Sequence, residues 1–180
     1  MNEERSLLQR ASQLEEKALV EVFDCYHAGI YRYAMRLTGE AHLAEECTSE
    51  TFLRFLNALH KGMGPREHLQ AYLYRIAHNW ITDHYRSNNS RKEVQLAPDW
   101  QDDRTEEPAE ATDQQNDRKR VRAALALLTP DQRQVVTLKY LEGWDNEQIA
   151  LTLRKQVGSV KSLQHRGLGA LRRALSEKEG

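Results

Sequence analysis

The chain has 180 residues and a mass of 20.9 kDa, and its 26 basic and 27 acidic residues leave a formal net charge of −1. This length suits one domain or two small ones, and 39% hydrophobic with 29% charged residues favours a helical globular protein over a disordered one. The sequence lacks an apolar signal core and a bilayer-spanning run, and its two cysteines lack the spacing of a disulfide framework or zinc site. The composition therefore predicts a cytoplasmic protein without metal or cofactor, whose binding to nucleic acid would depend on local charge.

The N-terminal part of the chain contains two predicted helices after a polar start. Residues 1–17 are predicted to form an N-terminal extension that is either frayed or the loose start of the first helix. Over 18–39 and 41–60 apolar residues recur at helical spacing, and Gly39 stands where a helix C-terminal glycine belongs. Both cysteines fall on or near these apolar stripes and are interpreted as core residues rather than nucleophiles. The predicted inward-facing set includes Phe23, Cys25, Cys47 and Phe52.

A third helix is predicted after the sequence KGMGP at residues 61–65, which breaks the helical pattern. Its apolar stripe includes Trp80, which is assigned to the core. Aromatic, basic and amide side chains lie off the stripe, and this combination can stack unpaired bases and hold phosphates. The neighbouring Asp83 and His84 do not predict catalysis, because adjacent helical residues point in different directions and no nucleophile, phosphate loop or metal pattern accompanies them. The off-stripe residues are Tyr74, Arg75, His78, Asn79 and Arg86.

Residues 92–117 lose the apolar periodicity of the segments on either side. Acidic residues predominate in this stretch, and Pro98 and Pro108 interrupt any helix. Such a run cannot bury enough surface to fold alone, so it predicts a flexible acidic linker between two domains.

The C-terminal part is predicted to be a helix from 118 to 128, with Val121 facing inward, followed by a helix that ends at Gly143. A Thr-Pro-Asp-Gln sequence at 129–132 has the form of a helix start with a capping box. A second capping box, Asp145 with Gln148, opens a short helix that is followed by a polar turn over 154–158.

The last predicted helix has an apolar side that includes Leu168 and a basic, hydrogen-bonding side. Two helices joined by a tight turn, the second with such a face, predict a helix-turn-helix whose second helix enters the major groove. A helical hairpin with a solvated basic face is the alternative. The candidates for base edges are Ser159, Lys161, Ser162, Gln164 and His165, and the candidates for phosphates are Arg166, Arg172 and Arg173.

The sequences of five segments resemble a known family. Residues 147–150 (EQIA), 157–162 (VGSVKS) and 170–172 (ALR) closely resemble region 4 of bacterial sigma-70-type factors, and the small extracytoplasmic-function (ECF) members are the nearest group. AYLYRIAHNWITDHYR at 71–86 is similar to regions 2.3 and 2.4, and AEECTSETFLRFL at 44–56 is similar to region 2.2.

The resemblance implies three binding surfaces. Region 2.2 would dock on the clamp helices of the polymerase β′ subunit, although Glu46 replaces the usual Asp and Ser49 the usual Gln. The third helix would recognise the minus-ten element, with Asn79 at the floor of a pocket for a flipped-out base and the loop 61–70 as its lid. The implied polymerase-binding residues are Glu45, Glu46, Ser49, Glu50 and Phe52, and the implied minus-ten residues are Lys61, Arg66, Tyr74, Arg75, His78, Asn79, Asp83 and Arg86.

In the family, region 4 reads the minus-thirty-five element and contacts the β flap. Glycine is common there at the position of Arg154, where a left-handed backbone costs a non-glycine residue about 1 kcal/mol more. The turn is therefore expected to differ. The second helix of the helix-turn-helix also departs from the usual family sequence at residues 162–166, which predicts a promoter preference particular to this chain.

The chain is therefore predicted to be an all-α ECF-type sigma factor with two small helical domains. The expected parts are an extension (1–17), region 2 (18–91), a linker (92–117), region 4 (118–176) and a tail (177–180). The expected partners are core RNA polymerase, promoter DNA and an anti-sigma factor, with no membrane insertion and no enzymatic activity. A stand-alone helix-turn-helix regulator that binds duplex DNA is the main alternative, and a protein-binding scaffold is the third.

Overall fold

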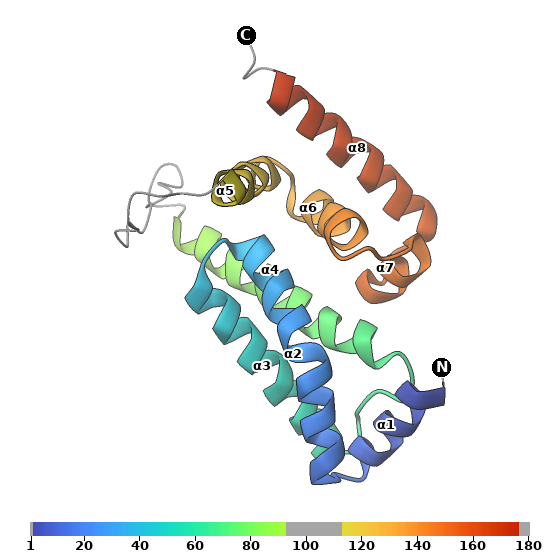
Figure 1. Ribbon diagram of the computed structural model, residues 1–180. Helices are drawn as coiled ribbons and strands as arrows, with labels where there is room; N and C mark the ends of the chain where they lie inside the picture. The colour runs from blue at the N-terminus through green and yellow to red at the C-terminus, as the bar shows by residue number, and fades with distance from the viewer. Residues whose placement is uncertain (1, 93–112, 177–180) are drawn as a thin grey trace.

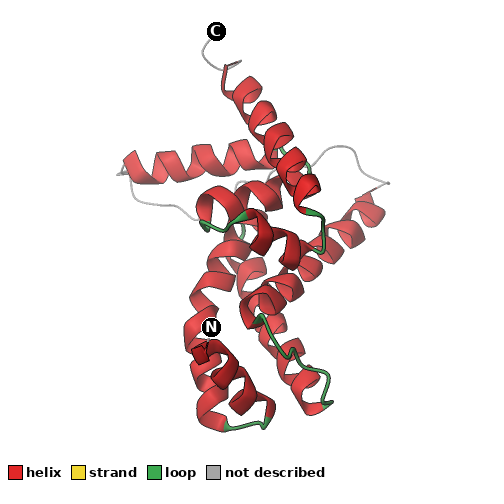
Figure 2. Ribbon diagram, turned by 90° about the vertical axis from the view of Figure 1, so that its right-hand side faces the viewer, coloured by secondary structure: helices red, strands yellow, loops and turns green. Residues whose placement is uncertain are grey.

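The computed structural model describes residues 2–92 and 113–176, and every regular element in these ranges is helical (Figures 1 and 2). The prediction of an all-α fold is confirmed. Most of the predicted linker and the tail 177–180 lie outside the described residues. The elements are α1 Asn2–Ser12, α2 Glu16–Thr38, α3 Ala41–His60, α4 Leu69–Lys92, α5 Asp113–Ala126, α6 Pro130–Val136, the π-helical turn η1 Thr137–Leu141, α7 Asn146–Leu153 and α8 Val157–Ser176.

The N-terminal half is built from α2, α3 and α4, each of which packs against the other two (Figure 1). Tyr33 from α2, Phe55 from α3 and Leu73 from α4 are fully buried between them. The predicted helix end at Gly39 is confirmed, since Gly39 has φ 74° and its N–H donates to the Met35 carbonyl at 2.9 Å.

The prediction of a frayed N-terminal extension is wrong. Residues 2–12 form α1, which packs on α2 and buries Leu7, Leu8 and Ala11. Three apolar residues at i, i+1 and i+4 are too few to mark a helix in a polar sequence, yet they suffice when a neighbouring helix supplies the surface that covers them.

Several predicted inward residues are in fact exposed. Phe23 retains 43% of its surface exposed, and Cys25, Val121 and Leu168 are exposed as well, whereas Cys47 and Trp80 are buried as predicted. Burial raises the pKa of the Cys47 thiol to about 12, which suits a core residue.

The C-terminal half contains α5 to α8, and both of its predicted capping boxes are present. The Thr129 side chain accepts from Gln132 N at 3.4 Å, and the Asp145 carboxylate accepts from Gln148 N at 2.7 Å. The single helix expected to run to Gly143 instead changes to the π-helical turn η1 after α6. Helix α5 also begins earlier than predicted, at Asp113 rather than at residue 118.

The two halves pack directly on each other. Helix α7 lies against α4, and η1 lies against α2 (Figure 1). One hydrophobic cluster runs through both halves and includes Leu73 and Ala77 of α4 with Leu138 and Ile149 of the C-terminal half. Within the described residues, no helix is both long and apolar enough to cross a membrane.

Candidate nucleic-acid interface

The second helix of the predicted helix-turn-helix, α8, is held by one apolar edge and is open on the other. Val160 and Leu163 are buried, and Gly167 lets α6 approach closely, since a Cβ there would lie 2.9 Å from Val136 Cγ2. Of the predicted contact residues, Gln164 is half-buried and donates to Asn146 Oδ1 at 2.6 Å. The remaining ones are exposed: Ser159, Lys161, Ser162, His165, Arg166, Arg172 and Arg173.

The turn before α8 has the left-handed geometry that glycine would favour. Arg154 has φ 51° and ψ 45°, and the next amide, Lys155 N, donates to Ala150 O at 3.0 Å. The turn was expected to differ because arginine replaces glycine. Arg154 instead adopts the strained left-handed conformation itself. The polar turn is also shorter than the predicted 154–158, because α8 begins at Val157.

A polar hollow of about 530 Å³ flanks the start of α8 and is lined by Ser159, Ser162 and Arg166 among others. At its edge Lys155 Nζ lies 3.0 Å from Asp131 Oδ2, so one cation near the recognition helix is already paired. The open, polar character of this face suits contact with DNA through bases and phosphates.

The face of α4 that was predicted to contact separated DNA strands is divided by the packing of the two halves. Tyr74 is 3% exposed, and Arg75 and His78 are half-buried. The expectation that Tyr74 lies away from the core is wrong, because the C-terminal half supplies a second core surface there. The other residues of this set remain exposed: Lys61, Arg66, Asn79, Asp83 and Arg86.

Aromatic and polar contacts hold this part of α4 against the C-terminal half. The Tyr74 ring lies 4.6 Å from the Trp144 ring, centroid to centroid, at an angle of 54°. Arg75 Nε donates to Thr152 O at 3.1 Å, and its Nη2 donates to Leu151 O at 3.2 Å. Burial raises the pKa of Tyr74 to about 12 and lowers that of Arg75, as expected for groups that are taken out of water.

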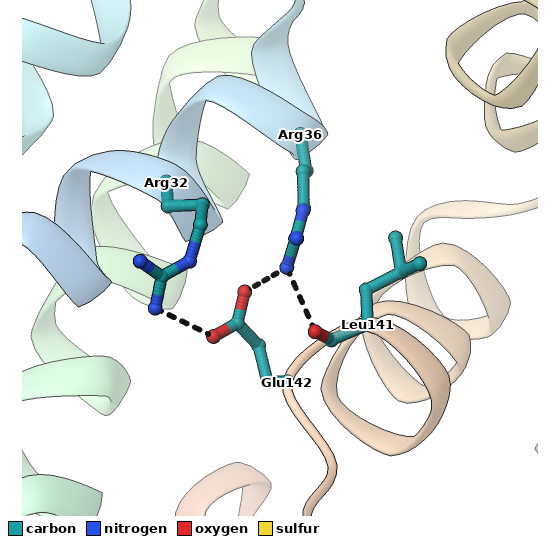
Figure 3. Close-up of polar contacts among 4 residues, drawn as sticks. All are labelled: Arg32, Arg36, Leu141 and Glu142. Atoms are coloured by element: carbon teal, nitrogen blue, oxygen red, sulfur yellow. Dashed lines mark hydrogen bonds and ion pairs between the residues drawn. The ribbon is translucent and has the colours of Figure 1, made fainter. Parts of the chain in front are cut away.

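A second contact between the halves is an ion-pair cluster of Glu142 with Arg32 and Arg36 (Figure 3). The Glu142 side chain is 5% exposed, and one of its oxygens lies 3.6 Å from Arg32 Nη2 while the other is bonded to Arg36. Arg36 Nη1 also donates to Leu141 O at 3.1 Å. The π-helical turn ends at Leu141, so Leu141 O and the Glu142 carboxylate meet the same guanidinium (Figure 3).

The contact surface between the halves also contains polar atoms that lack a partner. His78 Nδ1, Gln134 Oε1 and Thr152 Oγ1 are buried without a hydrogen bond within the described residues. Such an atom costs roughly 1–3 kcal/mol. Burial lowers the pKa of His78 to about 4, with Lys155 lowering it further and Asp131 and Asp83 opposing the shift. These unpaired atoms therefore offset part of the stability that the contact between the two halves provides.

The predicted polymerase-binding residues lie on α3. Glu45, Glu46 and Ser49 are exposed, and Glu50 is paired with Arg54 at 2.6 Å. Phe52 is buried, with its ring 4.9 Å from the ring of Phe23 on α2. Phe52 is therefore inside, as the apolar stripe predicted, and the exposed ring beside it is that of Phe23.

Sequence reasoning missed the residues that join the halves. Glu142 and Trp144 were not assigned any role. Trp144 stands in the polar run GWDNEQ, where a large apolar residue has no helical stripe to join, and this isolation was the available signal. Nothing in the local pattern marks Glu142, because its partners are more than a hundred residues away.

Comparisons with known proteins match both halves. A family model described as Sigma-70 region 2 matches residues 22–91, and one described as Sigma-70, region 4 matches residues 118–171. The ECF RNA polymerase sigma factor SigL of Mycobacterium tuberculosis is 34% identical over 171 residues, which cover 93% of this chain and 94% of SigL. BldN of Streptomyces coelicolor, another ECF RNA polymerase sigma factor, is 31% identical over 172 residues, which cover 95% of this chain but 65% of BldN.

A solved structure shares the fold. The sigma factor RpoE from Bartonella quintana, crystallised with the anti-sigma factor NepR, superposes with a TM-score of 0.67 at 19% identity, covering 89% of this chain and 98% of RpoE.

Proposed function

Because this chain belongs to the ECF sigma factors of the sigma-70 family, we propose that it binds core RNA polymerase, directs it to particular promoters and promotes transcription initiation. In this proposal, residues 18–91 act as region 2 and residues 118–176 act as region 4, with 92–117 as the connection between them. The protein would act in the cytoplasm, where the polymerase is, and would contribute recognition rather than catalysis.

The observation that carries the proposal is the open face of α8. Its apolar edge is fixed by Val160 and Leu163, and its side chains for base edges and phosphates point outward. We assign reading of the minus-thirty-five element to Ser159, Lys161, Ser162, Gln164 and His165, and phosphate contacts to Arg166, Arg172 and Arg173.

Minus-ten recognition is assigned to α4 and the loop before it. Asn79 is exposed on α4 and suits the floor of a base pocket. Tyr74, Arg75 and His78 reach DNA only after the two halves separate, because Tyr74 contacts Trp144, Arg75 donates to α7 and His78 is half-buried. We therefore propose that the halves move apart when the protein joins polymerase. The remaining minus-ten candidates are Lys61, Arg66, Asp83 and Arg86.

Polymerase docking is assigned to the acidic face of α3, with Glu45, Glu46, Ser49 and Glu50. Phe52 would act through Phe23, whose ring it supports. Region 4 is expected to contact the β flap. An anti-sigma factor is a further proposed partner, because RpoE from Bartonella quintana was solved with one.

The main rival is a helix-turn-helix regulator that binds duplex DNA without polymerase. Such a protein usually binds as a dimer to a palindrome. It would leave the acidic face of α3 and the partly covered face of α4 without a role. No feature of the described residues favours it.

A run-off transcription assay with purified core polymerase and a library of promoter fragments tests the proposal. Glu50→Lys should abolish transcripts by reversing charge at the docking face, and Asn79→Ala should abolish those that depend on the minus-ten base. Glu16→Lys and Ser87→Ala, at exposed positions of α2 and α4, serve as matched controls. Tight binding of the protein alone to a duplex site, without any polymerase-dependent transcript, would favour the rival.

A further inference from the structure

Helix α1 lies outside the matched region 2 segment, which begins at residue 22, yet it is packed into the fold. Leu7, Leu8 and Ala11 fix it on α2 through an apolar face. This face explains why the helix forms. It leaves unexplained the polar edge of α1, which reaches the segment that leads into α4 (Figure 1).

Two contacts join that polar edge to residues 67–70. Glu4 Oε1 accepts a hydrogen bond from Gln70 N at 3.2 Å, in the first turn of α4. A carboxylate at this place accepts from one of the free amides at the start of α4 and interacts favourably with the helix dipole. An N-cap residue next to the helix in sequence would do the same. Arg5 Nη2 lies 3.0 Å from Glu67 Oε1 in the loop before α4.

The loop between α3 and α4 has a backbone that is sensitive to its surroundings. Gly62 and His68 both have left-handed φ values, 67° and 56°, and His68 is the residue directly before α4. Gly64 packs against the Leu59 side chain so closely that a Cβ would overlap it. A non-glycine residue in the left-handed region persists only when neighbouring contacts hold it there, and the contacts of α1 adjoin His68 on both sides.

A hollow of about 380 Å³ lies between α1 and this loop and is lined by Arg5, Gln9, Gly64 and Arg66 among others. The two polar contacts tie the loop to α1 at the C-terminal end of the loop. Changes at Glu4 or Arg5 would shift the loop without disturbing the apolar contacts of α1.

We propose that Glu4 and Arg5 of α1 are positioning residues that set the conformation of the 61–68 loop and thereby the base that the protein prefers in the minus-ten element. This inference rests on the proposed function, in which the loop covers the base pocket. Neither residue touches DNA in this account; each acts through the loop and the start of α4.

The test is transcription by holoenzyme, formed from the full chain and core polymerase, on promoters randomised across the minus-ten element. Glu4→Ala should lower the ratio of transcripts from the preferred base to the next base about fivefold, the factor that corresponds to a cap worth about 1 kcal/mol. Preference at the minus-thirty-five element should stay unchanged. Glu3→Ala, one residue away and exposed, is the matched control.

A charge exchange makes the test independent of Glu4. Arg5→Glu should reduce the same preference, and the double variant Arg5→Glu with Glu67→Arg should restore it, since both side chains are exposed and the exchange keeps the pair. An unchanged base preference in Glu4→Ala and Arg5→Glu, or an equal loss of transcripts from all promoters, overturns the inference. If the unaltered protein yields no transcript from any promoter, the proposed function itself fails, which is a different result.

Discussion

The two halves of the molecule differ in how they present the residues assigned to DNA. On α8, Lys161, Ser162 and His165 are exposed, whereas on α4 Tyr74 is buried and Arg75 is bonded to α7. The chemistry of the two tasks accounts for the difference. A face that reads duplex DNA is polar and is well solvated by water, but a face that stacks unpaired bases is aromatic and is stabilised by burial.

It follows that the aromatic face of an isolated chain tends to be covered by its own second half. The ring of Trp144 lies against Tyr74 at an angle of 54°, a tilted contact that covers the Tyr74 ring without the parallel stacking of a base. The polar face on α8 has no such competitor. Under the proposed assignments, the α8 surface is therefore open before any partner binds, whereas Tyr74 of the minus-ten face is covered and Asn79 stays exposed.

The largest expected effect comes from removing the covering ring. Trp144→Ala should lower the free energy of unfolding by about 3–5 kcal/mol, because it leaves a cavity against Tyr74. Urea unfolding measures this change. Tyr140→Ala, an exposed aromatic four residues earlier, is the control and should stay within about 0.5 kcal/mol of the unaltered protein. Equal effects of the two variants would mean that the aromatic contact does not hold the halves together.

The next effect concerns the Glu142 ion-pair cluster. Glu142→Gln removes the charge that faces Arg32 and Arg36 and should weaken the association of the halves by about 1–2 kcal/mol, less than for a fully buried pair because both arginines are partly exposed. Small-angle scattering should show a larger radius of gyration, and a single-stranded minus-ten oligonucleotide should bind more tightly. Glu147→Gln, exposed on α7, is the control. Tighter binding to duplex DNA by the same factor would argue against a role confined to α4.

A pH dependence should follow from His78, whose pKa is about 4 in the folded chain against about 6.5 when unfolded. The folded state favours neutral histidine, so its contribution is complete above about pH 6.5 and is lost as the pH falls toward 4. Protonation in the unfolded chain should lower the free energy of unfolding by less than about 1.4 kcal/mol per pH unit in this window. His78→Gln should remove this part of the slope, whereas His165→Gln, exposed on α8, should not. An identical slope in both variants would contradict the assignment.

Features that depend on neighbouring residues could be predicted from the sequence, whereas features that depend on distant segments could not. Capping boxes at Thr129 and Asp145 and the helix end at Gly39 depend on neighbouring residues, and all three predictions are confirmed. The outward side chains of α8 also follow from helical periodicity. Tyr74 was misjudged because its cover comes from a segment some seventy residues away.

Errors at the other helices have a related cause. Periodicity marks an apolar stripe but not its width, so Phe23, Val121 and Leu168 at the stripe margins were placed inside although each is exposed. Helix α1 was missed because its stability comes from α2 rather than from its own sequence.

The smallest expected effect tests the turn that orients α8. Arg154 has a left-handed backbone, which costs a non-glycine residue roughly 1 kcal/mol, and glycine in turn loses more conformational freedom on folding. Arg154→Gly should therefore stabilise the chain, but by less than about 1 kcal/mol, with duplex affinity nearly unchanged. Glu147→Gly, inside α7 and without positive φ, should destabilise it instead. Opposite signs in urea unfolding would show that the strain lies at Arg154, and a loss of stability in both variants would show that the arginine side chain contributes more than its backbone costs.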